Sequence, residues 1–482
     1  MAYTEFFCVS GGSNMNGGHI NANTEPSTTP VYSATNGAWS TVTNKFTPTS
    51  GNPSLTVKVG DFAHVFADGS TTPTYIGRVT AVSATDITIS STLKAGTAPT
   101  TAATGISINV GGAWAGPSGS VAFPFAFATA TLQDGSNNRP RINFKNNQTY
   151  SITAAITHNV AGPIKWQGYT TTAGDGGQAT IDGGTLGASY VLLSISNVAQ
   201  NYIEDFIFQN NGATGSASLF ATTVGGNSFA TYRRLVFAHS RGHGMDLSGG
   251  GGAACRVIEC EAYDCNQSNT ANLAGFASTA GATVFVRCIS HDNTGGANAH
   301  GWVSRGAVLY HCISESNTGA GLKCTSNGAI EILVNCDFYN NTLDGYLVAS
   351  GGGVTSVYAE NCNFVKNGGY GLNLVDPSIG FYQLINNGFG AGTQVNTNGQ
   401  TNITTGTDVA EVIGSVTYAN DVTPWVDPAN GDFRINLAAA KAAGRGAFTQ
   451  TAASYTGALA YLDIGSNQHQ DTGGGSTGFF IQ

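Results

Sequence analysis

Short apolar strings recur along the middle of the chain, and each one runs into a polar turn. Two of them read Cys-Ile-Ser-His-Asp-Asn-Thr at 288–294 and Cys-Ile-Ser-Glu-Ser-Asn-Thr at 312–318, and equivalent strings begin at 260, 336 and 362. Successive starting points, from 260 through 288, 312 and 336 to 362, are separated by 28, 24, 24 and 26 residues. Repeats of about 20–50 residues indicate a solenoid or a propeller, and a propeller blade needs about 40. The spacing therefore predicts a solenoid.

Each repeat also contains a second apolar segment, which begins at a glycine, as in Gly301-Trp-Val and Gly321-Leu-Lys. No segment within the repeats has the 3.6-residue period of a helix, which leaves coils of short strands. We predict a parallel β-solenoid over residues 119–400. Alternate side chains of a strand face opposite sides. One repeat is therefore expected to place Ile330, Ile332, Val334, Cys336 and Phe338 inside and Glu331, Leu333, Asn335 and Asp337 outside.

Two residue types keep a fixed place in the repeats. The cysteines that open the strings are expected to stack inside the coils as small hydrophobic side chains: Cys260, Cys288, Cys312, Cys336 and Cys362. Metal binding explains them less well, because the chain has no Cys-x2-Cys pair. Asparagine tolerates a left-handed backbone and can hydrogen-bond along a stack. It follows four of the cysteines at a distance of five residues, at Asn293, Asn317, Asn341 and Asn367.

The flanking regions have a different pattern. Before residue 118, alternating segments such as Val57–Phe66 and Tyr75–Val79 are joined by turns rich in Gly, Ser, Thr and Pro, which predicts a small antiparallel β-barrel or sandwich. A cap helix is expected at Phe123–Thr131, and another short helix at Leu437–Ala443, where Gly444 follows. The predicted domains are an N-terminal β-module over 1–118, the β-helix over 119–400 and a capping region over 401–482.

Composition narrows the set of partners. The chain has 482 residues, 66 of them glycine, and only 10% are charged. Its formal charge of −9 argues against nucleic acid or an anionic membrane as the partner, because both require basic patches. The N-terminus lacks signal-peptide features and no apolar run reaches transmembrane length. We therefore expect folding in a cytoplasm, with the nine cysteines reduced, and we predict no cofactor and no metal.

Together with the repeats, the segments Ile164-Lys-Trp-Gln-Gly168 and Gly174-Asp-Gly-Gly177 resemble the right-handed parallel β-helix proteins. Pectate lyases, polygalacturonases and bacteriophage tailspikes share this pectate-lyase-like architecture. A β-module ahead of a β-helix is similar to tailspikes and capsid-decoration proteins, which implies a structural virion protein made in the host cytoplasm. The resemblance further implies attachment to other virion proteins through residues 1–118, contact with a host-surface polysaccharide, and a homo-oligomer, commonly a trimer in that family.

The alternative function is a polysaccharide depolymerase, either a glycoside hydrolase or a lyase, acting on host capsule or cell wall. Polygalacturonase-like enzymes carry a Gly-His-Gly motif together with clustered aspartates. Here the motif Gly242-His243-Gly244 stands without those aspartates, so we interpret His243 as a turn residue beside the repeat glycine.

Stacking places equivalent side chains of neighbouring coils about 4.8 Å apart. His291 over Glu315 is one expected pair, and the simpler interpretation is a ladder of exposed side chains that sets the register of the coils. The sharper hypothesis is a glycan groove, with acid and base residues drawn from Glu315, Asp292, Asp337 and His291 and with binding aromatics Tyr263, Trp302, Tyr310 and Tyr339. We expect no catalysis there, because His291 favours an ionised Glu315 and the sequence reveals no apolar pocket that would raise its pKa.

Overall fold

The described part of the chain is built from β-strands and two short 3-10 turns, as the alternating pattern predicts. The computed structural model describes residues 4–22, 24–67, 70, 74–99, 104–118, 140–158, 165–185, 187–196, 201–223, 229–248, 255–278, 283–325, 330–349, 356–374, 381–390, 395–397, 412–413, 416–418, 423–430 and 432–435. Both expected helices, at 123–131 and 437–443, lie outside these residues. The chain forms two units, one of residues 1–213 and 219–236 and the other of residues 214–218 and 237–482.

Six strands of the first unit close into an antiparallel barrel in the order β2-β3-β6-β5-β4-β7. Trp39, Phe46 and Tyr75 fill its interior and are at most 2% exposed. The expectation of a small β-barrel is thus confirmed. The bounds are β2 (Tyr32–Ser40), β3 (Lys45–Thr47), η1 (Pro53–Leu55), β4 (Phe62–Phe66), β5 (Tyr75–Val82), β6 (Ile87–Gly96) and β7 (Ile106–Val110).

The first strand of the chain does not belong to the barrel. β1 (Thr4–Cys8) pairs in parallel with β8 (Pro140–Lys145) in the sheet of the β-helix. The two ends of the barrel meet, because the Val31 N–H donates to the Val110 carbonyl at 2.9 Å. The barrel is therefore an insertion between two strands of the solenoid, although the predicted module 1–118 included β1.

The remaining strands of the first unit stack as parallel coils. Phe144, Trp166 and Phe206 line their interior, with the Phe144 ring centroid 5.4 Å from that of Trp166 and 5.0 Å from that of Phe206. The bounds are β9 (Thr149–Ser151), β10 (Ile156–His158), β11 (Lys165–Tyr169), β12 (Ala179–Asp182), β13 (Leu193–Ser196), β14 (Tyr202–Gln209), β15 (Phe220–Thr223) and β16 (Thr231–Ala238), the last of which runs on into the second unit.

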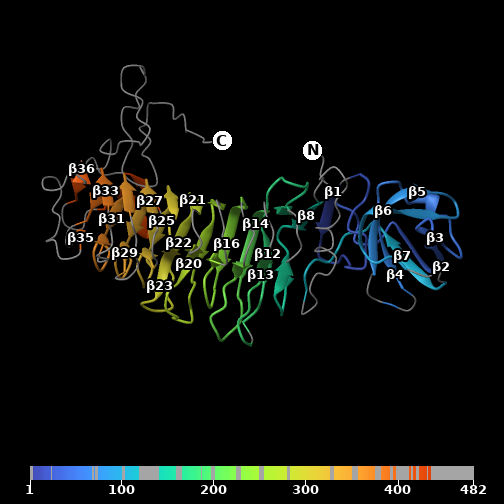
Figure 1. Ribbon diagram of the computed structural model, residues 1–482, viewed down its shortest axis with the longest axis horizontal. Coiled ribbons are helices and arrows are strands. Elements are labelled where there is room, and N and C mark those ends of the chain that lie inside the picture. The colour runs from blue at the N-terminus through green and yellow to red at the C-terminus, as the bar shows by residue number, and fades with distance from the viewer. Residues whose placement is uncertain are drawn as a thin grey trace, which may run out of the picture. The chain divides into compact units, whose positions relative to one another are not determined.

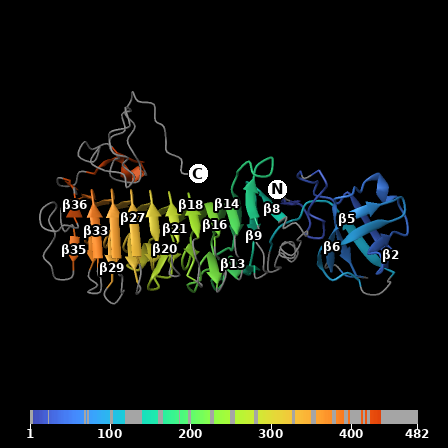
Figure 2. The same cartoon turned by 45° about the horizontal axis from the view of Figure 1, so that its top comes forward.

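The second unit is a parallel β-solenoid whose strands form three rows, drawn as parallel arrows in Figures 1 and 2. The first row is β18 (Arg256–Ile258), β21 (Val284–Val286), β24 (Val308–Tyr310), β27 (Ile330–Val334), β30 (Ser356–Glu360), β33 (Phe381–Ile385) and β36 (Val412–Ile413). The second is β19 (Glu261–Tyr263), β22 (Ile289–His291), β25 (Ile313–Glu315), β28 (Asp337–Tyr339), β31 (Asn363–Val365), β34 (Gly388–Phe389) and β37 (Val416–Thr417). The third is β17 (Met245–Asp246), β20 (Leu273–Ser278), β23 (Ala299–Ser304), β26 (Leu322–Cys324), β29 (Tyr346–Val348), β32 (Leu372–Leu374) and β35 (Val395–Thr397).

Left-handed residues form the corners on both sides of the second row. The residue before each repeat cysteine has φ between +52° and +55°, at Glu259, Arg287, His311, Asn335 and Asn361. A second corner, with φ between +48° and +56°, follows four residues after the cysteine, at Asp264, Asp292, Ser316, Asn340 and Lys366. Single left-handed residues turn the chain sharply, and here they isolate strands of three residues.

These corners shift the inward–outward alternation by one residue. Cys336 and Phe338, after the corner, lie inside as predicted. Before the corner the prediction is wrong: Leu333 and Glu331 are fully buried, whereas Ile330 is 57% exposed. A left-handed residue breaks the two-residue period of a strand. The sequence-based prediction assumed one unbroken period across Asn335, which is left-handed.

The cysteine and asparagine columns stand where the repeats place them. The five repeat cysteines are buried and free of disulfides. The asparagines form a ladder in which the Nδ2 of Asn293, Asn317 and Asn341 each donates to the Oδ1 of the next asparagine, at 2.6, 2.8 and 2.9 Å. The predicted stack of hydrogen bonds is confirmed, but the left-handed backbone belongs to the residue before each ladder asparagine.

Candidate functional site

The outer face of the second row carries the ionisable residues singled out by sequence. In its three-residue strands the middle residue points inward, as the buried Ser290 and Phe338 do, so the first and third residues face outward. The third positions of β19, β22, β25 and β28 are in register, pairing Tyr263 with His291, His291 with Glu315, and Glu315 with Tyr339. We call Glu261, Tyr263, His291, Asp292 and Glu315 the strip.

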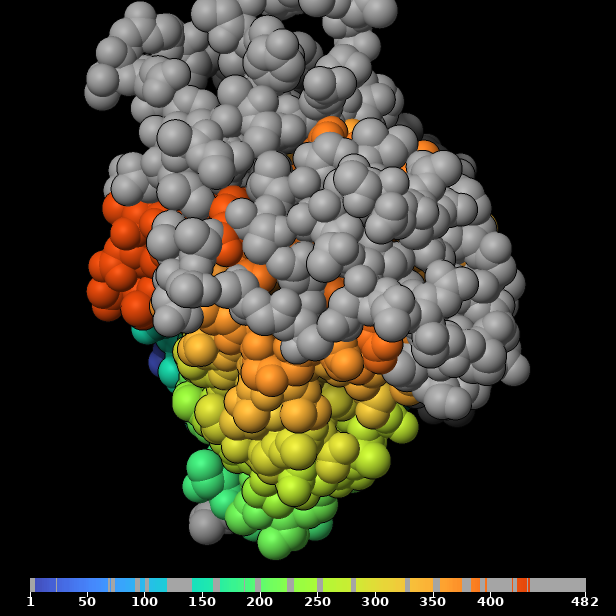
Figure 3. Space-filling model, turned by 90° about the vertical axis from the view of Figure 1, so that its left-hand side faces the viewer, coloured from blue at the N-terminus to red at the C-terminus, as the bar shows by residue number. Residues whose placement is uncertain are grey.

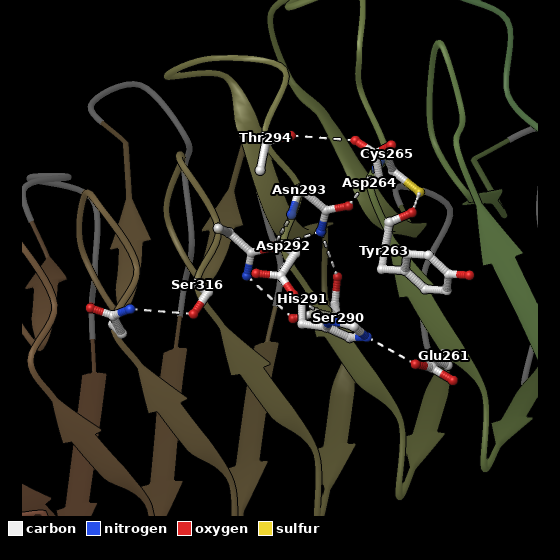
Figure 4. A network of polar contacts seen from close by, with 12 residues as sticks. Glu261, Tyr263, Asp264, Cys265, Ser290, His291, Asp292, Asn293, Thr294 and Ser316 are labelled. Carbon is white, nitrogen blue, oxygen red and sulfur yellow. Dashed lines mark hydrogen bonds and ion pairs between the residues drawn. The ribbon is translucent and has the colours of Figure 1, made fainter. Parts of the chain in front are cut away.

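His291 is held by two carboxylates (Figure 4). Its Nε2 lies 2.9 Å from Glu261 Oε1 and its Nδ1 lies 2.9 Å from Asp292 Oδ2. Burial alone would lower the pKa of His291, but the hydrogen bonds and charges of Glu261 and Asp292 raise it to about 9. The expected stacking on Glu315 is present, yet the partners of the ring are these two other acids. His291 is therefore a fixed imidazolium at neutral pH.

Tyr263 stands between two histidine rings. Its ring is stacked on that of His291 at 5.3 Å and 23°, and it meets that of His239 edge-on at 5.6 Å and 82°. His239 is oriented by Asp264, whose Oδ2 lies 2.7 Å from His239 Nδ1. Thr294 Oγ1 donates to the other oxygen of Asp264 at 3.3 Å, as Figure 4 shows. One face of Tyr263 is thus occupied by His291, and its hydroxyl can meet a ligand.

Glu315 departs from the expectation that it would be ionised. Burial raises the pKa of its carboxyl to about 7; the charge of His291 opposes this effect and that of Asp292 adds to it. The expectation that no apolar surroundings exist is therefore wrong. At neutral pH a large share of Glu315 is protonated and can donate a hydrogen bond.

The apolar cover comes from a distant part of the chain. β38 (Trp425–Asp427) and β39 (Asp432–Ile435), joined by the 3-10 turn η3 (Pro428–Asn430), form the C-terminal hairpin. Trp425 and Phe433 pack on outward residues of the second row, in a cluster with Ile313, Tyr339, Val365 and Tyr418. In Figure 3 the orange-red residues of this region lie against the flank of the coils. Through Ile313 and Tyr339 this cluster borders Glu315 on its own strand and on the following coil.

Three of the predicted site residues are not available to a ligand. Trp302 lies inside the coil and is 1% exposed, because it stands at an inward position of β23. Tyr339 does face outward, but the hairpin covers it and leaves it 7% exposed. Asp337 is fully buried and accepts a hydrogen bond from Asn363 Nδ2, while Asn363 in turn accepts one from Tyr418. Tyr310 is partly exposed, but it belongs to β24 in the first row, away from the strip.

His243 has the structural place that the sequence suggests. The Ala274 N–H donates to its Nδ1 at 2.9 Å, so the ring bridges two coils at a turn. His300 accepts in the same way from the Ala320 N–H at 2.9 Å. Sequence reasoning missed His300, Glu261 and Asp264. The only signal for His300 is its place directly before a repeat glycine, which it shares with His243.

The described ranges contain neither a metal-binding cluster nor a membrane-spanning helix. No group of three or more His, Cys, Asp or Glu side chains there could hold a metal ion. Likewise, among those residues no helix is long and apolar enough to cross a membrane.

Comparisons with known proteins agree with the coil geometry. A family model described as "Right handed beta helix region" matches residues 222–408. Among solved structures, the crystal structure of the pectate lyase Pel9A is similar, with a TM-score of 0.51 and 17% sequence identity over 72% of this chain and 91% of that chain. A search of curated proteins found no match. The fold is therefore a right-handed parallel β-helix of the pectate-lyase-like type, with an antiparallel six-stranded barrel near its N-terminus.

Proposed function

We propose that the chain is a structural protein of a bacteriophage particle, whose rigid β-helix binds a host-surface polysaccharide along the strip. The observation that carries the binding role is the fixed set of donors and acceptors on three successive coils. His291 is locked between Glu261 and Asp292, and Glu315, whose pKa burial raises to about 7, stands beside them and can donate in its protonated form. Sugar hydroxyls both donate and accept, so such a mixed, preorganised set suits a polyhydroxylated chain.

The structural role is supported by the way the coils are joined. The asparagine ladder and the histidines at the turns satisfy buried polar groups between neighbouring coils. Buried hydrogen bonds between coils favour a rigid stack, and the asparagine ladder supplies them on successive coils. A stiff solenoid suits a protein that must hold a binding face away from a particle.

Particle attachment is assigned to the inserted barrel, and it rests on the resemblance to tailspikes and decoration proteins. The barrel has its own core, and its two chain connections meet at Val31 and Val110. It also packs on β1, where the Phe62 ring lies 4.9 Å from that of Phe6. Particles assembled with a chain lacking the barrel should not contain it, whereas particles assembled with the full chain should. Equal incorporation of both chains would contradict the attachment role.

Binding is tested with the purified chain and a panel of host capsular and cell-wall polysaccharides. Glu315→Gln keeps the shape of the side chain and should weaken binding only modestly at neutral pH, whereas His291→Ala removes the centre of the strip and should weaken it at least about tenfold. Glu259→Gln is the matched control, because Glu259 lies at a corner and pairs with Arg287 outside the strip. Unchanged affinity in His291→Ala would reject the strip as the binding site.

A depolymerase is the second candidate, and the raised pKa of Glu315, about 7 because of burial, favours it. A hydrolase needs one carboxylic acid to protonate the glycosidic oxygen and one carboxylate to assist the attacking water or act as nucleophile. Glu315 and Asp292, on adjacent coils, are the pair that the strip offers. New reducing ends that appear with the wild type and disappear with both Glu315→Gln and Asp292→Asn would establish this activity. Binding without cleavage would leave the structural role.

A further inference from the structure

We propose that the C-terminal hairpin is a positioning element of the strip: by covering the neighbours of Glu315 it removes water from that carboxyl and keeps it a hydrogen-bond donor. Without it, the strip would present the Tyr263 hydroxyl as its one neutral donor, beside carboxylates and the imidazolium of His291. This inference rests on the proposed polysaccharide site, because it concerns what that site offers to a ligand.

The first support comes from the strand of Glu315 itself. Ile313 and Glu315 are the first and third residues of β25, so both face outward on the same coil. Ile313 is only 6% exposed, because it belongs to the cluster formed with Trp425 and Phe433. The hairpin therefore excludes water along the strand up to the position next to Glu315.

The second support comes from the following coil. Tyr339 is the register partner of Glu315, and its ring centroid lies 5.2 Å from that of Trp425 and 6.0 Å from that of Phe433. The Trp425 and Phe433 rings are themselves 5.1 Å apart, so the three aromatics form one edge-to-face group. Glu315 is thus bounded by hairpin-covered side chains along its own strand and on one neighbouring coil.

The charges that face Glu315 do not account for a neutral carboxyl. On the open side, the preceding coil brings His291, whose positive charge favours ionisation, and Asp292, whose negative charge opposes it. On the covered side, Tyr339 also feels the charge of Asp427 from the hairpin. Burial is the largest influence on the Glu315 pKa, so removing the cover should return that pKa towards 4.5.

The protonation state decides which ligand atoms Glu315 can contact. A neutral carboxyl donates to a ring, glycosidic or hydroxyl oxygen, whereas a carboxylate only accepts. Polysaccharide binding should therefore weaken as the pH rises through about 7 in the intact chain. With the hairpin loosened, the same loss should appear at a lower pH.

The experiment measures the titration of Glu315 directly, without any polysaccharide. The chain has nine glutamates, so selective carboxyl ¹³C labelling with Glu315→Gln as the assignment reference gives a tractable NMR spectrum. The wild-type midpoint is expected near 7. In the double variant Trp425→Ser/Phe433→Ser it should fall by at least about one pH unit. Val426→Ser is the matched control, because Val426 lies on the same hairpin but is 47% exposed, and it should leave the midpoint unchanged.

An unmoved midpoint in the double variant overturns the inference, provided that the repeat cysteines remain unreactive and the coils are therefore folded. If the double variant does not fold, Phe433→Leu loosens the same contact more gently and must lower the midpoint by a smaller amount; no change there also overturns it. Because no ligand is present, a failure of polysaccharide binding rejects the proposed function without touching this result.

Discussion

At the residue scale, the left-handed corners explain most of what sequence reasoning got wrong about side-chain directions. The repeats locate Cys336 and the ladder asparagines, because spacing alone fixes equivalent positions. They do not reveal that the residue before the cysteine is left-handed, since that position holds Glu259, Arg287 and Asn335 in different coils. Of these residue types only asparagine favours the left-handed conformation, and the other coils hold a different residue there. The three-dimensional corner is a property of the stack and carries almost no local signature.

The corner at Lys366 gives a stability prediction. A lysine with φ of +56° is strained, whereas asparagine adopts this conformation more readily. Lys366→Asn should stabilise the chain by about 0.5–1 kcal/mol in urea unfolding. The same change at Lys323, which lies in β26 and is not among the positive-φ residues, should be neutral or destabilising. A loss of stability in Lys366→Asn would contradict the role given to the corners.

The buried thiols give a second prediction at this scale. Cys312 Sγ donates to the Tyr310 carbonyl at 3.4 Å and is 1% exposed, and the other repeat cysteines are equally enclosed. Because burial also raises the pKa of Cys312, little reactive thiolate forms. Thiol reagents should label these cysteines only as the chain unfolds. Rapid labelling under native conditions would mean that the column does not face inward.

At the scale of elements, the columns of stacked polar side chains could be predicted from the sequence. The apolar cover that the C-terminal hairpin forms beside Glu315 could not. Asn293 and Asn317 recur at a fixed distance from a cysteine, so stacking brings them together. The contact of Trp425 with Tyr339 joins segments 86 residues apart in sequence (425 − 339). Neither segment carries a sequence pattern that predicts this contact. The raised pKa of Glu315 was therefore beyond sequence reasoning, because burial in the folded chain raises it and no local motif does.

The asparagine ladder should be most costly to break in its middle. Asn317 is fully buried; its amide donates to Asn341 and accepts from Asn293. Asn317→Ala should cost about 2–3 kcal/mol, because it leaves buried donors and acceptors unpaired. Asn367→Ala, at a half-buried end of the ladder, should cost less. Equal losses in the two variants would argue that the ladder does not act as a chain of bonds.

The turn histidines make stability depend on pH. His300 accepts a backbone N–H through Nδ1, so that nitrogen cannot take up a proton without losing the bond. Burial is the main reason that its pKa falls from 6.5 to about 3, with smaller contributions from Lys323 and His243. The unfolded chain then binds one proton more than the folded chain. The contribution of neutral His300 to the free energy of unfolding is therefore fully present above about pH 6.5, and it is lost as the pH drops towards 3.

Urea unfolding at pH 7 and pH 5 checks this dependence. His300→Gln cannot be protonated and should show a smaller loss between the two pH values than the wild type. His239→Gln is the control, because the His239 side chain is 45% exposed and its Nδ1 pairs with Asp264 rather than with a backbone N–H. A pH dependence that is unaltered by His300→Gln would remove His300 as its source.

At the scale of the whole molecule, the barrel is an insertion with its own core that follows β1 and precedes β8. Replacing residues 32–110 by a short glycine linker should leave the β-helix folded. The ends to be joined already lie close together, since the Val31 nitrogen is 2.9 Å from the Val110 carbonyl oxygen. Deleting residues 1–118 should instead destabilise it, since β1 leaves with the barrel and uncovers β8. Thermal unfolding and limited proteolysis of both variants test the difference. Similar stability of the two would contradict the insertion topology.

The C-terminal hairpin also has a mechanical consequence. Trp425 and Phe433 contact Tyr339 and share one hydrophobic cluster with Ile313 and Val365, and Ile289 packs against that cluster, which therefore spans four successive coils. Coils of a solenoid contact only their neighbours, so a pulling force can peel them away one at a time. Where this cluster links the four coils, the hairpin must detach before any one of these coils can separate from its neighbour. Stretching should therefore find the coils that carry Glu315 and Tyr339 to be the most resistant ones.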